Sequence, residues 1–258
     1  MKKIVLMFTL TSACLCFNMS FADQSTSIPS PNMASPTSTQ GKTPPAQTAL
    51  SGNFDITTNY MFRGISNSNN LPAFQGGLTY TFLKSGIYLN IWGSNIDQPD
   101  SQGNTGTLEI DTIAGIANDI GDHFHYDINI DRYNYPKSSL SYNEFIANAQ
   151  FYFLTAQLGY STNVYNSHGN GTYYNIGATS PIPPKYIFKL NDVTISGGLG
   201  HYSLPRNLGL YSYNDYNILL AKDIGIYNIA IQWTDTAGNT HAGPLGGNKI
   251  IGTLTANF

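Results

Sequence analysis

The sequence predicts an all-β protein with the fold of a transmembrane, antiparallel, up-and-down β-barrel of about twelve strands. Three observations predict it. Polar and apolar residues alternate in one short segment after another, the N-terminus has the layout of an export signal, and only 10% of the 258 residues are charged. Alternation with period two places apolar side chains on one face of a strand and polar side chains on the other.

Residues 1–22 have the layout of a secretory signal peptide. Lys2 and Lys3 form a positive start, residues 4–17 are largely apolar, and Ala22 completes a small-residue cleavage pattern. A membrane anchor is disfavoured because the apolar run is short and polar residues follow it. A lipoprotein signal that uses Cys14 stays open as a less favoured alternative. Cleavage after Ala22 removes both cysteines, which excludes a disulfide scaffold and thiolate chemistry from the mature chain.

Residues 23–50 form a low-complexity segment in which Ser, Thr, Gln and Pro dominate. A segment of this composition has too little apolar surface to bury, so it is expected to stay disordered. The predicted organisation is therefore a signal peptide over 1–22, a disordered periplasmic segment over 23–50 and an outer-membrane barrel over 51–258.

The composition indicates lipid as the main surroundings of the barrel. Ordinary soluble domains carry about 25% charged residues, far more than this chain. Aromatic residues reach 13%, with 18 Tyr and 13 Phe, and aromatic side chains are enriched where lipid meets water. The net charge is −3, or −5 without Lys2 and Lys3, and no basic block is present, which excludes nucleic acid as an expected partner.

The alternating segments give the predicted strands in chain order. An even number of strands is usual for bacterial outer-membrane barrels. One further piece, residues 185–188, lies in a Pro-rich connector and leaves the count open. The predicted strands cover residues 53–63, 74–82, 87–91, 108–116, 124–130, 145–151, 154–160, 174–178, 193–199, 216–220, 227–233 and 249–258.

The connectors alternate between short and long. Short turns on one side and long polar loops on the other are typical of these barrels, with the long loops outside the cell. An even strand count then returns both termini to the periplasm. The connector over 180–192 is an exception, because it is long but falls on the short-turn side.

Five strings occur in a characteristic order in the first half of the barrel. They are the segments 60–66, 75–77, 92–96, 108–111 and 142–144, which read YMFRGIS, QGG, WGSNI, LEID and YNE. In this order and spacing the chain resembles the TorF-type porin family of outer-membrane barrels. The resemblance spans residues 52–258, is sharpest in the first half, and implies a porin-like fold without supplying a ligand.

The sequence contains no strong signal for catalysis or metal binding. His201 and Ser203 share one face of a strand, but a bare His-x-Ser pair is a weak signal and Pro205 marks the strand end. His123 and His125 flank a tight turn and are interpreted as solvated residues. We therefore expect no enzyme activity, no cofactor and no metal.

Charged residues on the inward phase of the strands are the candidate pore-lining residues. Arg63, at the end of the first predicted strand, and Lys249, at the start of the last, are expected to form a basic seam. The acidic residues of the facing wall are Glu109, Asp111, Asp127, Asp131 and Glu144. In a lumen, opposed charges of this kind orient and select solutes.

The predicted function is passive diffusion of small polar solutes or ions through a narrow lumen in the bacterial outer membrane. Twelve strands about 4.8 Å apart with a tilt of about 40° give a backbone radius of roughly 12 Å, and side chains narrow it further. The alternative is a structural or adhesin barrel with a closed lumen and functional extracellular loops, and an outer-membrane enzyme is third. The expected partners are the lipid bilayer and the outer-membrane assembly machinery. The machinery is expected because the strand ending at Phe258 resembles an assembly signal.

The predicted topology can be tested with epitope tags on intact cells. Tags inserted at Ser101 and Gly238 should bind antibody, because both positions fall in predicted outer loops. A tag at Ser38 should bind antibody only after the outer membrane is permeabilised. Labelling of Ser38 on intact cells would reverse the topology.

Overall fold

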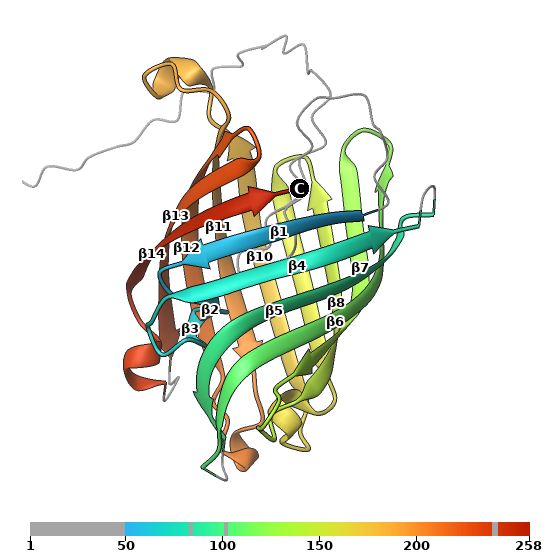
Figure 1. Ribbon diagram of the computed structural model, residues 1–258, viewed down its shortest axis with the longest axis vertical. Coiled ribbons are helices and arrows are strands. Elements are labelled where there is room, and N and C mark those ends of the chain that lie inside the picture. Colours follow the sequence, from blue (N-terminus) through green and yellow to red (C-terminus); the bar gives the residue numbers. More distant parts are fainter. Residues whose placement is uncertain (1–49, 83–84, 101–102, 239–241) are drawn as a thin grey trace, which may run out of the picture.

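A computed structural model describes residues 50–82, 85–100, 103–238 and 242–258. The predicted signal peptide and residues 23–49 of the predicted disordered segment lie outside the described residues. Within the described residues, twelve antiparallel strands close into one barrel, as Figure 1 shows. This confirms the predicted fold class and strand number.

Each barrel strand pairs with its neighbour in the sequence, and β14 pairs with β1 to close the sheet. Within the closed barrel no backbone edge is left unpaired, as a membrane-spanning sheet requires. The barrel strands are β1 (Leu50–Thr57), β4 (Ala73–Thr81), β5 (Ile87–Pro99), β6 (Thr105–Ile120), β7 (Phe124–Asn134), β8 (Tyr142–Phe151), β9 (Leu154–Ser161), β10 (Gly171–Pro181), β11 (Val193–Ser203), β12 (Tyr213–Ile224), β13 (Tyr227–Gly238) and β14 (Lys249–Asn257).

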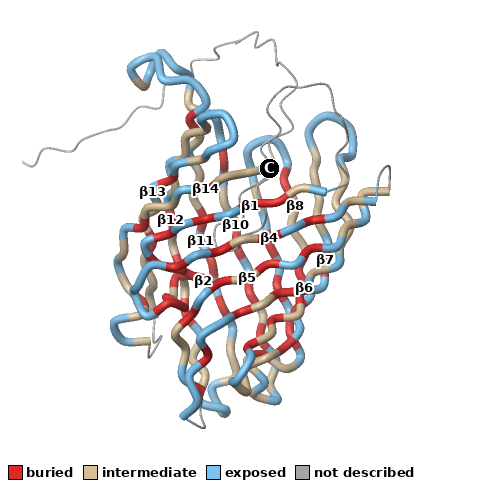
Figure 2. The backbone as a smooth tube through the Cα atoms, in the orientation of Figure 1, coloured by how far each residue is buried: buried red, intermediate tan, exposed pale blue. Residues whose placement is uncertain are grey.

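The barrel is apolar outside and polar inside. In β1 the side chains of Phe54 and Ile56 are exposed on the outer surface, whereas Asn53, Asp55 and Thr57 are buried toward the lumen. Figure 2 shows the same alternation of buried and exposed positions along the strands. This is the inverse of a soluble barrel and fits an outer surface in contact with lipid. No helix in the described part of the chain is long and apolar enough to cross a membrane.

The first predicted strand is too long. β1 ends at Thr57, and residues 58–72 turn into the barrel, where β2 (Met61–Phe62) and β3 (Ile65–Ser66) form a two-stranded hairpin. Its turn has positive φ at Arg63 (49°) and Gly64 (77°), as the type I′ two-residue hairpin turn requires at both central positions. Arg63 is therefore the tip of an inward hairpin, and the prediction that it ends a barrel strand was wrong.

The connectors differ between the two ends of the barrel. The end that holds Leu50 and Phe258, here called the terminal end, has short turns; the opposite end, called the loop end, has longer connectors. These carry the short helices η1 (Val164–Asn166), η3 (Arg206–Leu208) and η4 (Gly243–Leu245). The terminal and loop ends thus follow the predicted alternation of short and long connectors.

The connector before β11 is the exception at the terminal end, as predicted, but it contains no additional strand. It holds the short helix η2 (Pro184–Tyr186) and projects beyond the barrel in Figure 1. Pro184 occupies the start of the helix, where its missing N–H costs nothing. Phe188 and Lys189 follow with positive φ, which ends any extended conformation.

The C-terminal residue completes the sheet. The amide N–H of Gly52 donates to the carbonyl oxygen of Phe258 at 2.7 Å, and the amide of Phe258 donates to Gly52 at 2.9 Å. Gly52 also leaves room for the Phe258 ring, since a Cβ at position 52 would lie 2.7 Å from a ring carbon. Phe258 therefore contributes both backbone pairing and a ring contact to the closure.

Deleting Phe258 should lower the amount of folded barrel in the outer membrane several-fold, because the deletion removes the two backbone hydrogen bonds between Gly52 and Phe258 at the closing seam. The measurement is the heat-modifiable folded fraction on a gel. Phe258→Leu is the matched control, because it keeps the two backbone bonds and changes only the ring. Equal folded fractions for the deletion and the wild type would remove this role from Phe258.

Candidate functional site: a filled constriction in the lumen

The inward hairpin is a small folded unit of its own. The Ser66 and Ser68 hydroxyls both donate to Oδ1 of Asn59, at 2.6 and 3.1 Å, and the amide of Asn67 donates to the Tyr60 carbonyl at 2.8 Å. The amide of Tyr60 donates to the Ser68 hydroxyl at 2.9 Å. These local bonds hold residues 59–68 in one shape, so the segment, here called the lumen hairpin, presents Arg63 at a fixed position.

Arg63 reaches across the lumen to Glu144 on β8. Its guanidinium donates to both carboxylate oxygens, at 2.9 and 2.7 Å, and both side chains are 1% exposed or less. Parallel hydrogen bonds of this kind are the strong form of the Arg–carboxylate pair. The hydroxyl of Tyr133 donates to the same carboxylate at 3.1 Å. Glu144 thus anchors the hairpin tip to the opposite wall.

Aromatic rings surround the guanidinium. Its carbon lies 4.7, 4.2 and 4.6 Å from the ring centroids of Phe62, Tyr173 and Tyr202. A guanidinium held against aromatic faces is stabilised by the negative face of each ring, most strongly where water is excluded. Tyr173 and Tyr202 belong to β10 and β11, so the wall of the barrel supplies most of this cage.

Two glycines make room for the bridge. A Cβ at Gly159 on β9 would lie 2.8 Å from Arg63 Nη2 and 2.9 Å from Glu144 Oε1. Gly64 has φ +77°, and a Cβ there would lie 2.6 Å from the Thr236 methyl group on β13. The ion pair therefore packs directly against the backbone of β9, and the hairpin tip against β13.

The acidic wall predicted from the sequence forms on three adjacent strands. Asp131 on β7 lies directly opposite Glu144 on β8, and Asp111 on β6 lies opposite Tyr133. Glu109 accepts a 2.8 Å hydrogen bond from the Tyr135 hydroxyl. All four carboxyl groups are buried at the loop-end half of the lumen, and Asp215 on β12, also buried, lies against Gly64 at the hairpin tip.

The predicted basic seam does not form. Lys249 lies on the inward phase of β14, but its Nζ donates to the carbonyls of Pro244 and Gly246, at 2.6 and 3.0 Å, instead of facing the acidic wall. Asp127 lies nearer the terminal end and accepts a 2.9 Å bond from the Tyr88 hydroxyl. The structure thus joins Arg63 to Glu144 and leaves Lys249 and Asp127 in separate contacts.

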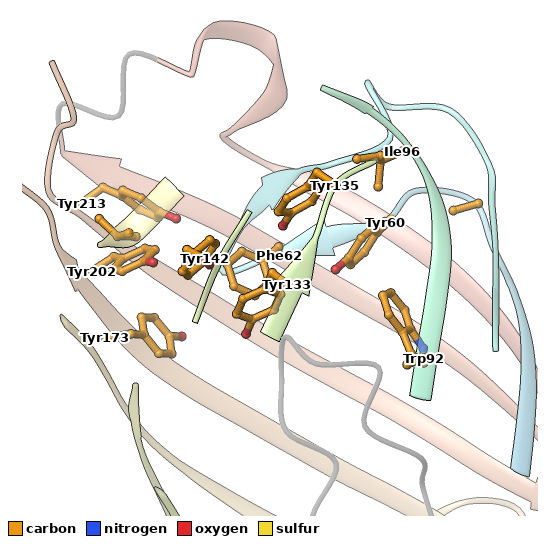
Figure 3. Close-up of a cluster of buried hydrophobic side chains, with 12 residues drawn as sticks. Tyr60, Phe62, Trp92, Ile96, Tyr133, Tyr135, Tyr142, Tyr173, Tyr202 and Tyr213 are labelled. Atoms are coloured by element: carbon orange, nitrogen blue, oxygen red, sulfur yellow. The ribbon is translucent and has the colours of Figure 1, made fainter. Parts of the chain in front are cut away.

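Tightly packed aromatic side chains fill the lumen around the bridge. Tyr133 stacks on Tyr142 with ring centroids 4.7 Å apart, and Tyr142 meets Tyr165 of η1 at 5.2 Å. Figure 3 shows the cluster, whose described members are Tyr60, Phe62, Ala73, Trp92, Ile96, Tyr133, Tyr135, Tyr142, Val164, Tyr173, Tyr202 and Tyr213. Side chains that line an open aqueous pore keep contact with water, whereas these are buried. In this conformation the constriction is closed at the level of Arg63.

The phenol of Tyr165 adds no charge to the constriction. Burial raises the pKa of Tyr165 to about 12. The hydroxyl therefore stays protonated at physiological pH and contributes only a dipole. The charge at this level comes from Arg63 and the carboxyl groups.

Amide side chains line the lumen between the constriction and the terminal end. Gln157 donates to Asn148 at 2.8 Å, and Asn90 donates to the Thr79 hydroxyl at 2.8 Å. Neutral amides can donate and accept hydrogen bonds with a passing solute. The inward amides of this half include Asn90, Asn129, Asn148, Gln157, Asn175 and Asn217.

The weak His-x-Ser pair does not assemble into a catalytic arrangement. His201 and Ser203 are both exposed on the outward phase of β11, and His201 Nδ1 lies 2.7 Å from Oδ1 of Asn214. His125 Nδ1 lies 2.8 Å from Asp119, a cross-strand partner that the sequence analysis did not identify. These contacts explain both histidines as local pairs on strand surfaces or turns.

Sequence reasoning missed the aromatic cage. Tyr133, Tyr173 and Tyr202 lie on the inward phase near the loop end of their strands, and the composition had been interpreted as an aromatic belt facing lipid. The signal was available in the phase: Tyr133 alternates with Asp131, and both point into the lumen. At Tyr60 and Phe62 the pattern did not indicate an inward position, because these residues continue the alternation of β1.

The fold defines the class of protein, which is a closed, antiparallel β-barrel with an apolar outer surface. The chain is similar to the solved structure of the KdgM porin, with a TM-score of 0.51 and 11% identity over 81% of this chain and 99% of that one. It is also similar to the NanC porin, with a TM-score of 0.50 and 10% identity over 81% of this chain and 98% of that one. At these identities the likeness shows the fold.

The chain itself belongs to the family described as "Bacterial protein of unknown function (Gcw_chp)", whose model matches residues 41–256. A comparison with curated proteins gives no match. The family description does not name the TorF-type porins that the sequence resembles, so that finer assignment stays a prediction.

The energetic importance of the bridge can be tested with a double-mutant cycle. Arg63→Ala and Glu144→Ala should each lower the free energy of unfolding by about 3 kcal/mol, because each leaves one buried charge without its partner. The double variant should lose less than the sum of the two, since no buried charge is then left over. Urea unfolding from lipid vesicles measures all three.

Arg132→Ala is the matched control for this cycle. Arg132 is the neighbour of Asp131 on the outward phase of β7, where it donates to Asn134 and Asn143 at 3.2 and 3.3 Å. Its loss should cost no more than about 0.5 kcal/mol. Strictly additive losses in the Arg63–Glu144 cycle would show that the two side chains do not act as a pair.

Proposed function

We propose that this protein is a gated porin: a barrel in the outer membrane through which small polar solutes or ions diffuse when the lumen hairpin leaves the constriction. The observation that carries the proposal is the lumen hairpin itself. A chain segment that folds into a barrel, and whose tip is held at the opposite wall by an ion pair, is a removable obstruction once that pair and the bonds of Tyr60 and Asn67 to Glu109 open. The half beyond it is lined with neutral amides, most of them also buried, so a polar path there requires these side chains to separate as well.

The porin-type fold supports placement in the outer membrane, with the loop end outside the cell and both termini in the periplasm. The short turns at the terminal end and the longer connectors at the loop end support this orientation. The TorF-type resemblance and recognition by the outer-membrane assembly machinery belong to the same proposal. In it, Arg63, Glu109, Asp111, Asp131 and Glu144 line the constriction, and Asp127 and Lys249 line the lumen elsewhere.

The second candidate function is a structural or adhesin barrel with a permanently closed lumen. One observation favours it: the constriction is filled by buried side chains such as Tyr133, Tyr142 and Tyr202. Against it stands the chemistry of the closure. Permanent plugs gain most from apolar packing, whereas a buried ion pair gives little net stability for its cost. An enzyme is the least supported function, because the one His-x-Ser pair of interest faces outward.

Conductance in planar bilayers tests the porin proposal. The wild type should give discrete, infrequent openings, and Arg63→Ala should open far more often, because the hairpin loses its anchor. If the Arg63–Glu144 ion pair stabilises the closed state by only about 1.4 kcal/mol, its loss raises the open population about tenfold. A folded barrel that stays silent in the wild type and in Arg63→Ala would support the closed structural barrel.

Reversal potentials across a salt gradient test which residues line the path. The excess of carboxyl groups predicts a modest cation preference that Arg63→Ala increases and that weakens near 1 M salt, where the screening length is about 3 Å. Glu109→Gln combined with Glu144→Gln should shift the preference toward anions. Identical potentials in all variants would show that these side chains do not line the path.

A further inference from the structure

We propose that the pocket occupied by the Arg63 guanidinium is a recognition site for organic cations, and that a solute with a guanidinium or primary ammonium group enters the constriction by taking the place of Arg63 at Glu144. This inference rests on the proposed function and names the class of solute. The protein's own arginine shows how such a group is held.

The binding groups of the pocket belong mainly to the barrel wall. Glu144, which accepts the hydrogen bonds of the guanidinium, belongs to β8, and Tyr133, which donates to Glu144, belongs to β7. The rings of Tyr173 and Tyr202 belong to β10 and β11. The hairpin supplies only Arg63 and Phe62. When the hairpin moves out, the wall therefore retains a carboxylate that can accept two parallel hydrogen bonds, flanked by two tyrosine rings. Such a set binds planar organic cations.

The pocket also holds carboxyl groups that Arg63 does not pair with. Asp131 lies directly across from Glu144, and Asp111 lies on the neighbouring strand. Oδ1 of Asp131 and Oδ1 of Asp111 are buried and have no hydrogen-bond partner among the described residues. A buried carboxylate oxygen without a donor is costly, and an incoming ammonium or guanidinium group supplies donors. An anionic solute brings no such donors.

Arg63 acts as a tethered competitor for this site. The apparent affinity for a free cation is lowered by the fraction of time that Arg63 is bound. Weak apparent binding suits passage, because a solute that binds tightly does not leave. At the base of the hairpin the Asp97 N–H donates to the Asn67 carbonyl at 2.8 Å, and in the segment that follows the hairpin Asn70 Nδ2 donates to the Pro244 carbonyl at 3.2 Å. These bonds lie away from the tip, and in this proposal the hairpin, which its local bonds keep in one shape, moves as a unit about this attached base.

Chemical rescue of Arg63→Ala tests binding independently of conduction. The refolded variant is titrated in detergent with methylguanidinium below about 0.1 M, where denaturation by guanidinium is slight. Its thermal midpoint should rise saturably by about 3 °C or more, because the ligand binds the folded state alone. N-methylurea, a neutral molecule of nearly the same shape, should have no such effect.

Two further variants sharpen the binding test. Arg63→Ala with Glu144→Gln should lose the rescue, because the carboxylate is gone, and Arg132→Ala should behave like the wild type. If Arg63→Ala does not refold alone, the readout is its refolding yield with each compound present. Rescue of the yield by methylguanidinium and not by N-methylurea supports the site. Equal effects of the two compounds in either readout, including no effect at all, overturn it.

A transport measurement in the wild type completes the test. The permeability of methylguanidinium relative to K⁺, from reversal potentials, should fall several-fold in Glu144→Gln. Rescue without any conductance would support the cation site and contradict the porin function. Conductance without rescue, and without a change in relative permeability in Glu144→Gln, would support the porin function and contradict the cation site.

Discussion

The ion pair between Arg63 and Glu144 lies at the centre of the closed constriction. A guanidinium and a carboxylate that are both excluded from water are stable only as partners, because removing either leaves a buried charge. The hairpin tip must therefore stay at β8 for as long as Arg63 is desolvated. The aromatic rings that close the constriction pack around this pair, and Gly159 provides the space for it. The closure is thus organised around a contact between a loop and the opposite wall.

The barrel was predictable because its determinants are local. A strand between lipid and a polar lumen must alternate with period two, and this constraint acts on each pair of neighbouring residues. Phe54 and Ile56 against Asn53 and Asp55 show it in β1. The same phase placed Glu109, Asp131 and Glu144 correctly inside the lumen, on adjacent strands.

The constriction was not predictable in the same way, because it depends on contacts between distant residues. Residues 58–63 continue the alternation of β1, so nothing local separates a lipid-facing strand from a hairpin that turns inward. Only the Arg63–Gly64 turn, with its two positive φ angles, distinguishes them. The prediction for Lys249 was wrong for a related reason. The alternation placed Lys249 on the correct face of its strand, but its Nζ bonds to the nearby carbonyls of Pro244 and Gly246 instead of a carboxylate of the opposite wall.

Stability alone gives no reason for an arginine at the hairpin tip. Apolar residues of similar volume in place of a buried ion pair are often neutral or stabilising, so a permanent plug would be better built from leucine or phenylalanine. Phe62 and the surrounding tyrosines already supply apolar contacts at this level. An ion pair differs from such contacts in that another charged group of the right shape can replace one partner without leaving the other unpaired. The presence of Arg63 in an otherwise aromatic closure therefore favours a closure that exchanges over one that is fixed.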